Sequence, residues 1–304
     1  MHKVSIILTT YNSSASLQEV LDSLFSQQGI GHIFDLEIVA VDDSSSDNTI
    51  EILERNSVRY MKTEKNTGGP NYGRNLALSI CTGDYICFID HDDIWFPHKI
   101  KSLLSVADLA PIITSGYTML DSHRKRKNVR VNNVMDNTPY VLYKTNETFI
   151  QKLTKSRSGQ ETYLGSIMFH RSLKDILFET KYGMIDFDWV LRLFHNNSSV
   201  EFCDSLYLRK VSINNLSLNE TYRLNDYKFS MEFILHYQKD FSREVEIAAN
   251  RINGSLARYY YLIDNMTLAR KYFLKSTLEI KTILYLITTF AGSKIVKRYF
   301  NVFG

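Results

Sequence analysis

The sequence predicts an α/β fold in which helices flank a mostly parallel central sheet, followed by a C-terminal helical region. Over the first two-thirds of the chain, short apolar runs alternate with segments of helical periodicity, which is typical of βαβ units. Polar loops rich in aspartate follow several of the apolar runs. From about residue 220 no further strand pattern occurs. We therefore expect an α/β domain over residues 1–219 and a helical region over residues 220–304.

The first four predicted strands are short apolar runs, and they lie at residues 4–11, 36–41, 58–61 and 84–90. Helical segments separate them. The first helix carries Ser16 and, three residues later, Glu19, which is the pattern of a capping box; the next two begin near Asn48 and after Pro70. Right-handed crossovers bring the ends of such strands to one edge of the sheet.

The middle of the chain is less regular. We expect a helix after Pro97, a strand at residues 112–117, a solvated turn at the basic run 123–127, and a loop over residues 132–158. A helix with acidic residues in its first turn opens near residue 185. A last strand is predicted at residues 206–209.

The bulk composition excludes some classes of protein. The 36 basic and 33 acidic residues give a net charge of +3, which argues against a dedicated nucleic-acid binder. The three cysteines lack zinc-type spacing and are expected to be buried in a reducing compartment. Because the chain enters a strand at once and shows no signal peptide or membrane-spanning run, we expect it in the cytoplasm.

The most informative stretch is the fourth strand, which ends in three closely spaced acids, Asp90, Asp92 and Asp93. Crowded carboxylates repel one another unless a cation lies among them. Oxygen ligands of this kind suit Mg²⁺ or Mn²⁺, which proteins often share with substrate phosphates. The alternative is an acidic loop that caps the next helix.

Five blocks in order resemble the family-2 inverting glycosyltransferases, which have a GT-A fold and use nucleotide-diphosphate sugars. The blocks are residues 4–12, 41–49, 66–75, 88–97 and 185–192. The resemblance implies a metal ion, Mn²⁺ or Mg²⁺, held by Asp90 and Asp92. It also implies a nucleotide-binding set: Thr9, Tyr11, Asp42, Asp43, Gly69, Arg74, Asp90 and Arg209. Within this set we favour Asp43 as a ligand and a structural role for Asp42.

The same resemblance places the catalytic base near residue 186. A carboxylate in a cleft can take the proton of an acceptor hydroxyl, and Asp186 is the first candidate. The family usually carries Glu-Asp here, whereas this chain has Ile185 before Asp186, so Asp188 is kept as a second candidate. Many members also carry a histidine after the last-strand arginine, but no histidine follows Arg209 closely.

The expected function is transfer of a sugar from a UDP- or dTDP-sugar to a hydroxyl of a glycan or lipid-linked acceptor, as in bacterial surface-polysaccharide synthesis. Two alternatives stay open. One is sugar transfer to polyprenyl phosphate, and the other is a nucleotide-sugar-binding scaffold without turnover, which the missing glutamate keeps open.

The C-terminal stretch 276–303 mixes apolar residues with lysines, a composition that suits a membrane interface. It predicts peripheral contact with the inner face of the plasma membrane. Packing of these helices on the catalytic domain or on a second subunit is the alternative.

Overall fold

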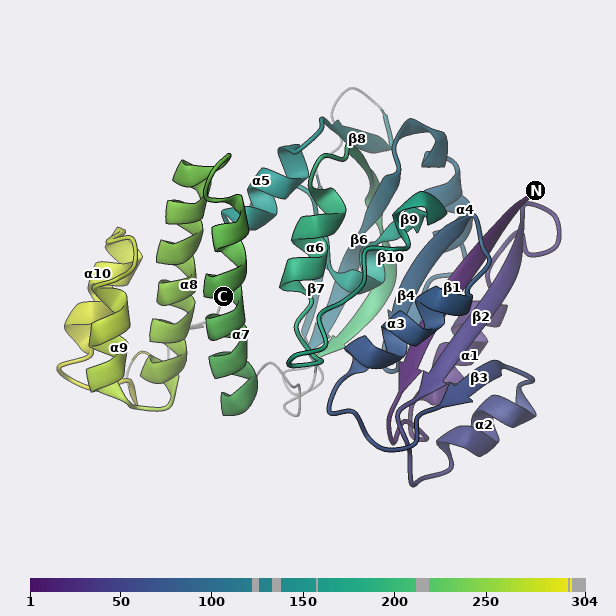
Figure 1. Ribbon diagram of the computed structural model, residues 1–304, viewed down its shortest axis with the longest axis horizontal. Coiled ribbons are helices and arrows are strands. Elements are labelled where there is room, and N and C mark those ends of the chain that lie inside the picture. Colours follow the sequence, from purple (N-terminus) through teal and green to yellow (C-terminus); the bar gives the residue numbers. More distant parts are fainter. Residues whose placement is uncertain (122–125, 133–137, 157, 212–218, 295, 297–304) are drawn as a thin grey trace. The chain divides into compact units, whose positions relative to one another are not determined.

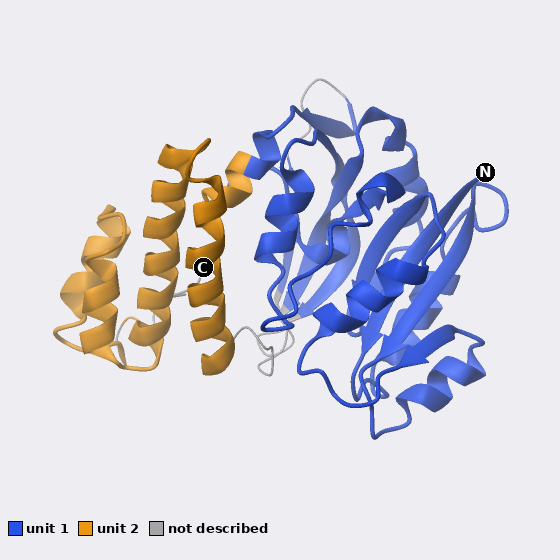
Figure 2. Ribbon diagram, in the orientation of Figure 1, with its two compact units in different colours: residues 1–149, 158–213 blue, residues 150–157, 214–304 orange. Residues whose placement is uncertain are grey.

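The computed structural model describes residues 1–121, 126–132, 138–156, 158–211, 219–294 and 296 (Figure 1). The chain forms two compact units (Figure 2). Unit 1 contains residues 1–149 and 158–213, and unit 2 contains residues 150–157 and 214–304. Unit 1 is α/β and unit 2 is helical.

Unit 1 is built on one sheet, which has ten strands in the described part of the chain. Along its main path the order is β3-β2-β1-β4-β9-β6-β10-β5, while β7 pairs with β6 and β8 pairs with β10. The strands are β1 (His2–Thr10), β2 (Phe34–Asp42), β3 (Arg59–Lys62), β4 (Tyr85–Asp90), β5 (Ile94–Trp95), β6 (Ile112–Asp121), β7 (Arg126–Arg130), β8 (Tyr140–Tyr143), β9 (Met168–His170) and β10 (Ser199–Val211).

The sheet confirms the predicted α/β class, and its pairing is mixed. It is parallel from β3 through β2 and β1 to β4, and again between β6 and β10. The short strand β9 lies antiparallel between β4 and β6 and joins the two parallel parts. Because β1, β2 and β4 run in the same direction, their carboxyl ends reach one edge together.

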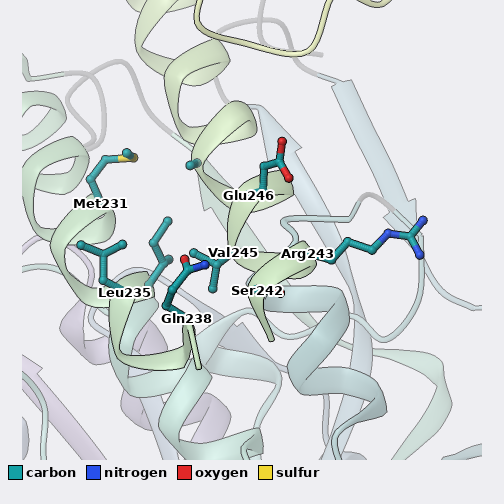
Figure 3. Close-up of a pocket in the computed structure, with 9 residues that line it drawn as sticks. Met231, Leu235, Gln238, Ser242, Arg243, Val245 and Glu246 are labelled. Atoms are coloured by element: carbon teal, nitrogen blue, oxygen red, sulfur yellow. The ribbon is translucent and has the colours of Figure 1, made fainter. Parts of the chain in front are cut away.

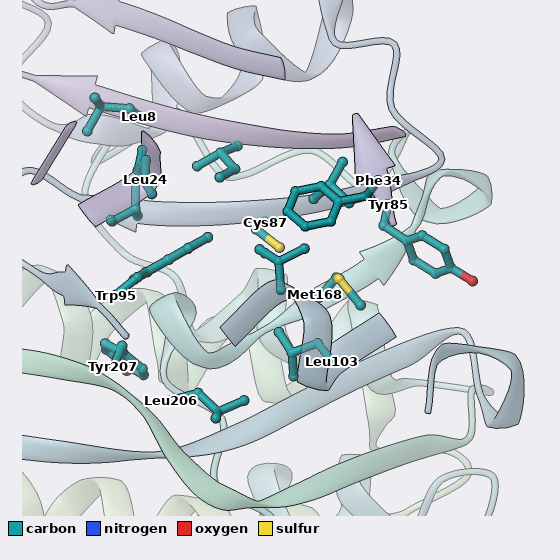
Figure 4. Close-up of a cluster of buried hydrophobic side chains, with 14 of the residues drawn as sticks. Leu8, Leu24, Phe34, Tyr85, Cys87, Trp95, Leu103, Met168, Leu206 and Tyr207 are labelled. Atoms are coloured by element: carbon teal, nitrogen blue, oxygen red, sulfur yellow. The ribbon is translucent and has the colours of Figure 1, made fainter. Parts of the chain in front are cut away.

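Helices cover both faces of this sheet. The helices of unit 1 are α1 (Leu17–Phe25), α2 (Thr49–Arg55), α3 (Pro70–Ile80), α4 (Lys99–Leu104), the start of α5 (Glu147–Leu153) and α6 (Phe187–Phe194). Side chains of α1 and α4 form a buried cluster with alternate residues of the central strands, among them Leu8, Cys87 and Leu103 (Figure 4). The intervening residue Phe88 points to the other face, where its ring contacts Trp189 of α6 and Phe178.

Two predictions about local structure were wrong. Ser16 and Glu19 form no capping box, because the Ser16 hydroxyl donates to the His91 carbonyl oxygen at 2.7 Å and Glu19 accepts from Lys210 Nζ at 2.6 Å. Residues 132–158 were predicted as a loop, but the described part forms β8 and α5. Of the basic run 123–127, residues 123–125 lie outside the described residues, and residues 126 and 127 belong to β7.

Unit 2 consists of the end of α5 and four further helices in its described part, α7 (Glu220–Ile234), α8 (Ser242–Leu262), α9 (Met266–Phe273) and α10 (Ile280–Thr288). Its core is aromatic: the ring of Tyr285 stacks on Phe273 at 5.9 Å and meets the edge of Tyr261 at 5.4 Å. None of the described helices is long and apolar enough to span a membrane.

The strand β2 supplies a stability prediction through Glu37. Partial burial acts to raise the pKa of this carboxyl, but hydrogen bonds from Ser5 and Thr82 and an ion pair with Lys3 outweigh it and lower the pKa from 4.5 to about 2. The folded state thus gains stability that is fully present above pH 4.5 and is lost as the pH falls toward 2. Glu37→Gln should lower the free energy of unfolding at pH 7 by about 1–3 kcal/mol, measured by urea unfolding.

The difference between the wild type and Glu37→Gln should shrink as the pH falls below 4.5. The matched control is Asp35→Asn, on the same strand at an exposed position, which should change stability by less than about 0.5 kcal/mol. A stability difference that stays constant from pH 7 to pH 3 would contradict the assignment.

Candidate functional site

The predicted site residues of the first half of the chain meet at the carboxyl ends of β1, β2 and β4. In the sheet register Thr9 lies between Val41 of β2 and Asp90 of β4. Tyr11 follows at the same edge, and 49% of its surface is exposed. The sheet therefore brings the end of β1 and the acidic end of β4 into one place.

The loops that follow β1 and β2 are bonded to each other. The Asn12 side-chain oxygen accepts from the Ser46 amide at 2.9 Å, and the Asn12 amide donates to Ser45 Oγ at 2.8 Å. Asn12 and Ser44 adopt positive φ angles of 47° and 63°, which lets the two chains turn sharply at this point. Hydrogen bonds thus hold the two loops together beside the strand ends.

The two acids at the end of β2 have different surroundings. Asp42 is fully buried and accepts hydrogen bonds from Thr10 Oγ1 and from the Ser45 amide, each at 2.9 Å. Asp43 accepts from Thr63 Oγ1 and from the Thr67 amide, each at 3.0 Å. Asp42 therefore ties the strand to its own loop, and Asp43 fixes the turn that leads into α3.

The start of α3 packs closely against two other segments. A Cβ atom at Gly69 would lie 2.3 Å from the Gly183 carbonyl oxygen, so no larger residue fits there. A Cβ atom at Gly73 would lie 3.1 Å from Thr9 Cγ2. Glycine at these positions lets the helix N-terminus approach both the strand ends and the loop before α6. Pro70 has no backbone N–H, and the Asn71 backbone amide donates to the Gly183 carbonyl oxygen at 3.0 Å, so the loop before α6 satisfies the start of this helix.

A buried arginine connects the acidic strand end to the loop before α6. Arg74, which is only 6% exposed, donates to Asp90 Oδ1 at 3.0 Å and to Asn71 Oδ1 at 3.1 Å, and its guanidinium lies over the Phe178 ring. The side-chain amide of Asn71 (Nδ2) donates in turn to the Ile185 carbonyl oxygen at 2.8 Å. Two side chains of α3 therefore link Asp90 to the residue directly before Asp186.

The acidic loop after β4 holds three carboxylates in graded burial. The Asp90 side chain is 46% exposed, Asp92 is half-buried, and Asp93 is 4% exposed and accepts from the Lys210 amide at 3.3 Å. Burial, with the charge of Asp90 adding, raises the pKa of Asp92 above its ordinary value. Burial raises the pKa of Asp93 well above its ordinary value, with Asp90 and Asp92 adding to the effect.

This donor set fits a divalent cation that is shared with a ligand. Two accessible carboxylates at the end of one strand are hard oxygen donors, which Mg²⁺ and Mn²⁺ prefer, usually with phosphate oxygens completing the shell. Within the described residues no group of three or more metal-binding side chains is already assembled. Asp90 and Asp92 thus offer a partial set of ligands.

A ladder of cations and aromatic rings runs beside the acidic loop. The Lys99 ammonium lies 4.8 Å from the Tyr207 ring centre, Tyr207 packs on Tyr117 at 5.7 Å, and Tyr117 meets Tyr163 at 5.0 Å. The Arg209 guanidinium lies over the Tyr163 ring at 4.3 Å. The aromatic faces therefore hold two cations close to the acids without neutralising those acids directly.

Lys99 is fully buried, and this burial lowers its pKa to about 8. Its ammonium donates to the Gly165 carbonyl oxygen at 3.0 Å. A Cβ atom at Gly165 would lie 3.2 Å from Asp93 Oδ2, so the acidic loop packs directly on this turn.

The two candidate bases differ in accessibility. Asp186 is the N-cap residue of α6 and is partly exposed. Asp188 is 2% exposed, and its Oδ2 accepts from Arg192 at 2.6 Å. Burial raises the pKa of Asp188, although Arg192 opposes this. Of the two carboxylates, Asp186 is the one that another molecule can approach.

Three residues that organise the site were not predicted from the sequence: Asn71, Glu179 and Tyr163. Glu179 accepts from the Asn71 side chain at 3.2 Å, from the Tyr182 amide at 2.8 Å and from the Ile185 amide at 3.1 Å, which fixes the loop before α6. The asparagine in the run Pro70-Asn71-Tyr72-Gly73-Arg74 was a usable signal, since it lies one helical turn before Arg74. Neither Glu179 nor Tyr163 stands in a recognisable pattern.

Carboxylates at the ends of parallel strands, with Arg74 of α3 beside them, define an α/β protein whose candidate ligand site lies at the carboxyl edge of its sheet. The particular family follows from the sequence. The family model for glycosyl transferase family 2 matches residues 5–177, more than half of the chain, and the chain belongs to this family.

Relatives share the first part of the chain. The poly(ribitol-phosphate) beta-N-acetylglucosaminyltransferase TarS of Staphylococcus aureus strain Mu50 is 38% identical over 112 residues, which are 36% of this chain and 19% of that protein. A poly(ribitol-phosphate) beta-glucosyltransferase of Bacillus spizizenii strain W23 is 40% identical over 96 residues, or 30% of this chain and 15% of that protein. The similarity therefore spans less than a fifth of each relative.

A solved structure is similar over nearly the whole chain. Residues 1–349 of S. aureus TarS, crystallised with UDP, match with a TM-score of 0.63 at 20% identity, covering 98% of this chain and 93% of that chain. This likeness confirms the GT-A fold that the sequence predicts.

The buried ion pair of α6 supplies a stability prediction. Asp188→Asn should lower the free energy of unfolding by about 1–3 kcal/mol, because it removes the charge that pairs with Arg192 inside the protein. Asp186→Asn should change it by less than about 0.5 kcal/mol, since Asp186 is partly exposed and its side chain makes no capping hydrogen bond to α6. Equal destabilisation by the two variants in urea unfolding would contradict the difference in burial.

Proposed function

We propose that this chain is an inverting glycosyltransferase that moves a sugar from a UDP- or dTDP-sugar to a hydroxyl of a glycan or lipid-linked acceptor. The observation that carries the proposal is the linkage of Asp90, Arg74, Asn71 and the residue before Asp186 at one edge of the sheet. In the proposal Arg74 and Asp90 serve the diphosphate and Asp186 serves the acceptor, and this linkage supports their belonging to one connected site. Membership of glycosyl transferase family 2 supports the reaction class.

In this proposal the nucleotide lies across the ends of β1 and β2. Thr9, Tyr11 and Asp43 line the side for the base and ribose, and Asp42 holds the loop that carries them. Gly69, where α3 packs closely on the loop before α6, would border the diphosphate, and Arg209 contributes a second positive charge beside the acids.

Asp90 and Asp92 would hold Mn²⁺ or Mg²⁺. When bound, the cation supplies positive charge that stabilises the leaving diphosphate. Arg74 has a complementary role, because its contact with Asp90 holds that carboxylate in place before any ligand binds.

Asp186 acts as the base in this proposal. Its carboxylate accepts the proton of the acceptor hydroxyl as the oxygen bonds to the anomeric carbon and the diphosphate leaves. A single displacement of this kind inverts the anomeric configuration. The hydrogen bonds of Asn71 and Glu179 fix the backbone of Ile185, the position where the family usually carries glutamate, so the loop is held by polar contacts that do not need that acid.

Similarity to poly(ribitol-phosphate) transferases supports an acceptor that is part of a bacterial surface polymer. We further propose that the chain acts in the cytoplasm, at the inner face of the plasma membrane. The acceptor hydroxyl would belong to a glycan or polyol chain.

Replacement of the base gives the sharpest test of the reaction. Asp186→Asn should lower kcat for sugar transfer by about 10²–10⁴-fold while KM for the donor changes little. The readout is release of UDP or dTDP and of transferred sugar with a panel of surface-polymer acceptors. Asp188→Asn is the control, and it should retain most of the activity per folded molecule. A larger loss of kcat in Asp188→Asn would transfer the assignment to that residue.

The metal assignment is tested by binding. Titration calorimetry with UDP and dTDP should show binding that Mn²⁺ strengthens at least about tenfold, and Asp92→Asn should abolish that enhancement. Asp204→Asn, a substitution of an exposed aspartate on β10, is the control and should behave as the wild type. Metal-independent binding would contradict the metal site, and binding without turnover on any acceptor would favour a scaffold.

A further inference from the structure

The helix α10 presents an apolar face outward within unit 2. Ile280, Ile283, Leu284 and Ile287 are spaced i, i+3, i+4 and i+7, so they share one side of the helix. Their exposed fractions are 80%, 42%, 58% and 61%. The buried side of the same helix carries Tyr285, which packs on the aromatic core of unit 2.

Neighbouring residues extend this apolar face. Phe290 is 78% exposed, and the Arg270 guanidinium lies 4.8 Å from its ring centre. Leu274 and Leu278, between α9 and α10, are 65% and 55% exposed. We call the set Leu274, Leu278, Ile280, Ile283, Leu284, Ile287 and Phe290 the α10 face. Apolar residues gathered in this way on a short segment mark an interaction surface.

The charged residues in the sequence that carries the α10 face are mostly basic, and the acid Asp264 lies beside its end, where it accepts a hydrogen bond from the Ser293 hydroxyl. Residues 266–294 contain five basic side chains, Arg270, Lys271, Lys275, Lys281 and Lys294, and one acidic side chain, Glu279. The four lysines lie at exposed positions. A basic rim around exposed leucine, isoleucine and phenylalanine complements an interface that is apolar inside and negatively charged outside.

We propose that the α10 face docks unit 2 on an anionic lipid bilayer. The apolar side chains enter the boundary between headgroups and acyl chains, and the lysines contact the lipid phosphates. No described helix could span the membrane, so the contact is peripheral. The proposal does not depend on the transfer reaction.

Unit 2 also contains a hollow lined by residues of α7 and α8, and its charged residues differ from those near the α10 face, so it provides the control. It has a volume of about 540 Å³ and is lined by Met231, Leu235, Arg243 and Glu246 among others (Figure 3). Leu235 is 60% exposed, as much as the residues of α10, but the charges beside it, Arg243 and Glu246, are of opposite sign. Charge complementarity to anionic lipid is therefore specific to the α10 face.

The test is flotation of the full chain with vesicles of phosphatidylcholine alone or of equal parts phosphatidylcholine and phosphatidylglycerol. The wild type should float with the anionic vesicles but not with the neutral vesicles. High salt should weaken its binding to the anionic vesicles. Leu284→Glu/Ile287→Glu should abolish flotation, and Lys275→Gln/Lys281→Gln should weaken it by about tenfold or more. Leu235→Glu should float as the wild type does.

Light scattering of the same proteins tests the alternative that the α10 face binds a second copy of the chain. If the wild type floats with neither kind of vesicle, the proposal is overturned. If it also forms a defined oligomer that Leu284→Glu/Ile287→Glu dissociates, the face binds a second copy of the chain. Circular dichroism of each variant should match the wild type, because the substituted side chains are exposed. UDP binding should be unchanged in all variants, so failure here leaves the proposed transfer reaction unaffected.

Discussion

The site depends on one buried cation, the guanidinium of Arg74. It bonds to Asp90 at the end of β4 and to Asn71 on its own helix, and Asn71 holds the backbone of Ile185. A guanidinium makes several directed hydrogen bonds from one plane, which suits it to join elements that are far apart in the sequence. This connection attaches both the acidic end of β4 and the loop before α6 to the same helix, α3.

The charge around the acidic loop follows the same logic. Three carboxylates lie within four residues, and burial makes the ionised forms of Asp92 and Asp93 unfavourable. The structure places Lys99 and Arg209 nearby but sets both against aromatic rings. The acids are thus only partly compensated within the protein. The cation and the phosphates that we propose at this loop would complete the compensation of these charges.

The sequence was sufficient for the first parallel strands of unit 1, but it did not predict the short strands β5, β7 and β8. The spacing of hydrophobic residues and the positions of turn residues located β1, β2, β4 and α3. The parallel topology predicted that Thr9, Asp43 and Asp92 would lie at one edge of the sheet. Local patterns failed where tertiary contacts decided the outcome. Ser16 matched a capping box, but its hydroxyl bonds to a distant carbonyl instead.

The loop prediction for residues 132–158 failed for a related reason. These residues lack clear periodicity because β8 has only four residues, and among the described strands it pairs with β10 alone. Glu179 was likewise invisible to sequence analysis, since its partners, the Asn71 side chain and two backbone amides, become neighbours only in the folded chain. Isolated residues with long-range partners leave no spacing that a sequence can reveal.

The central claim is that a divalent cation and a nucleotide diphosphate bind together at the end of β4. Anomalous diffraction at the manganese edge, from crystals grown with Mn²⁺ and UDP, tests it most directly. We predict one manganese peak within bonding distance of the Asp92 carboxylate, with the diphosphate between that peak and Arg209. A diphosphate bound elsewhere, or bound there with no manganese peak, would contradict the account.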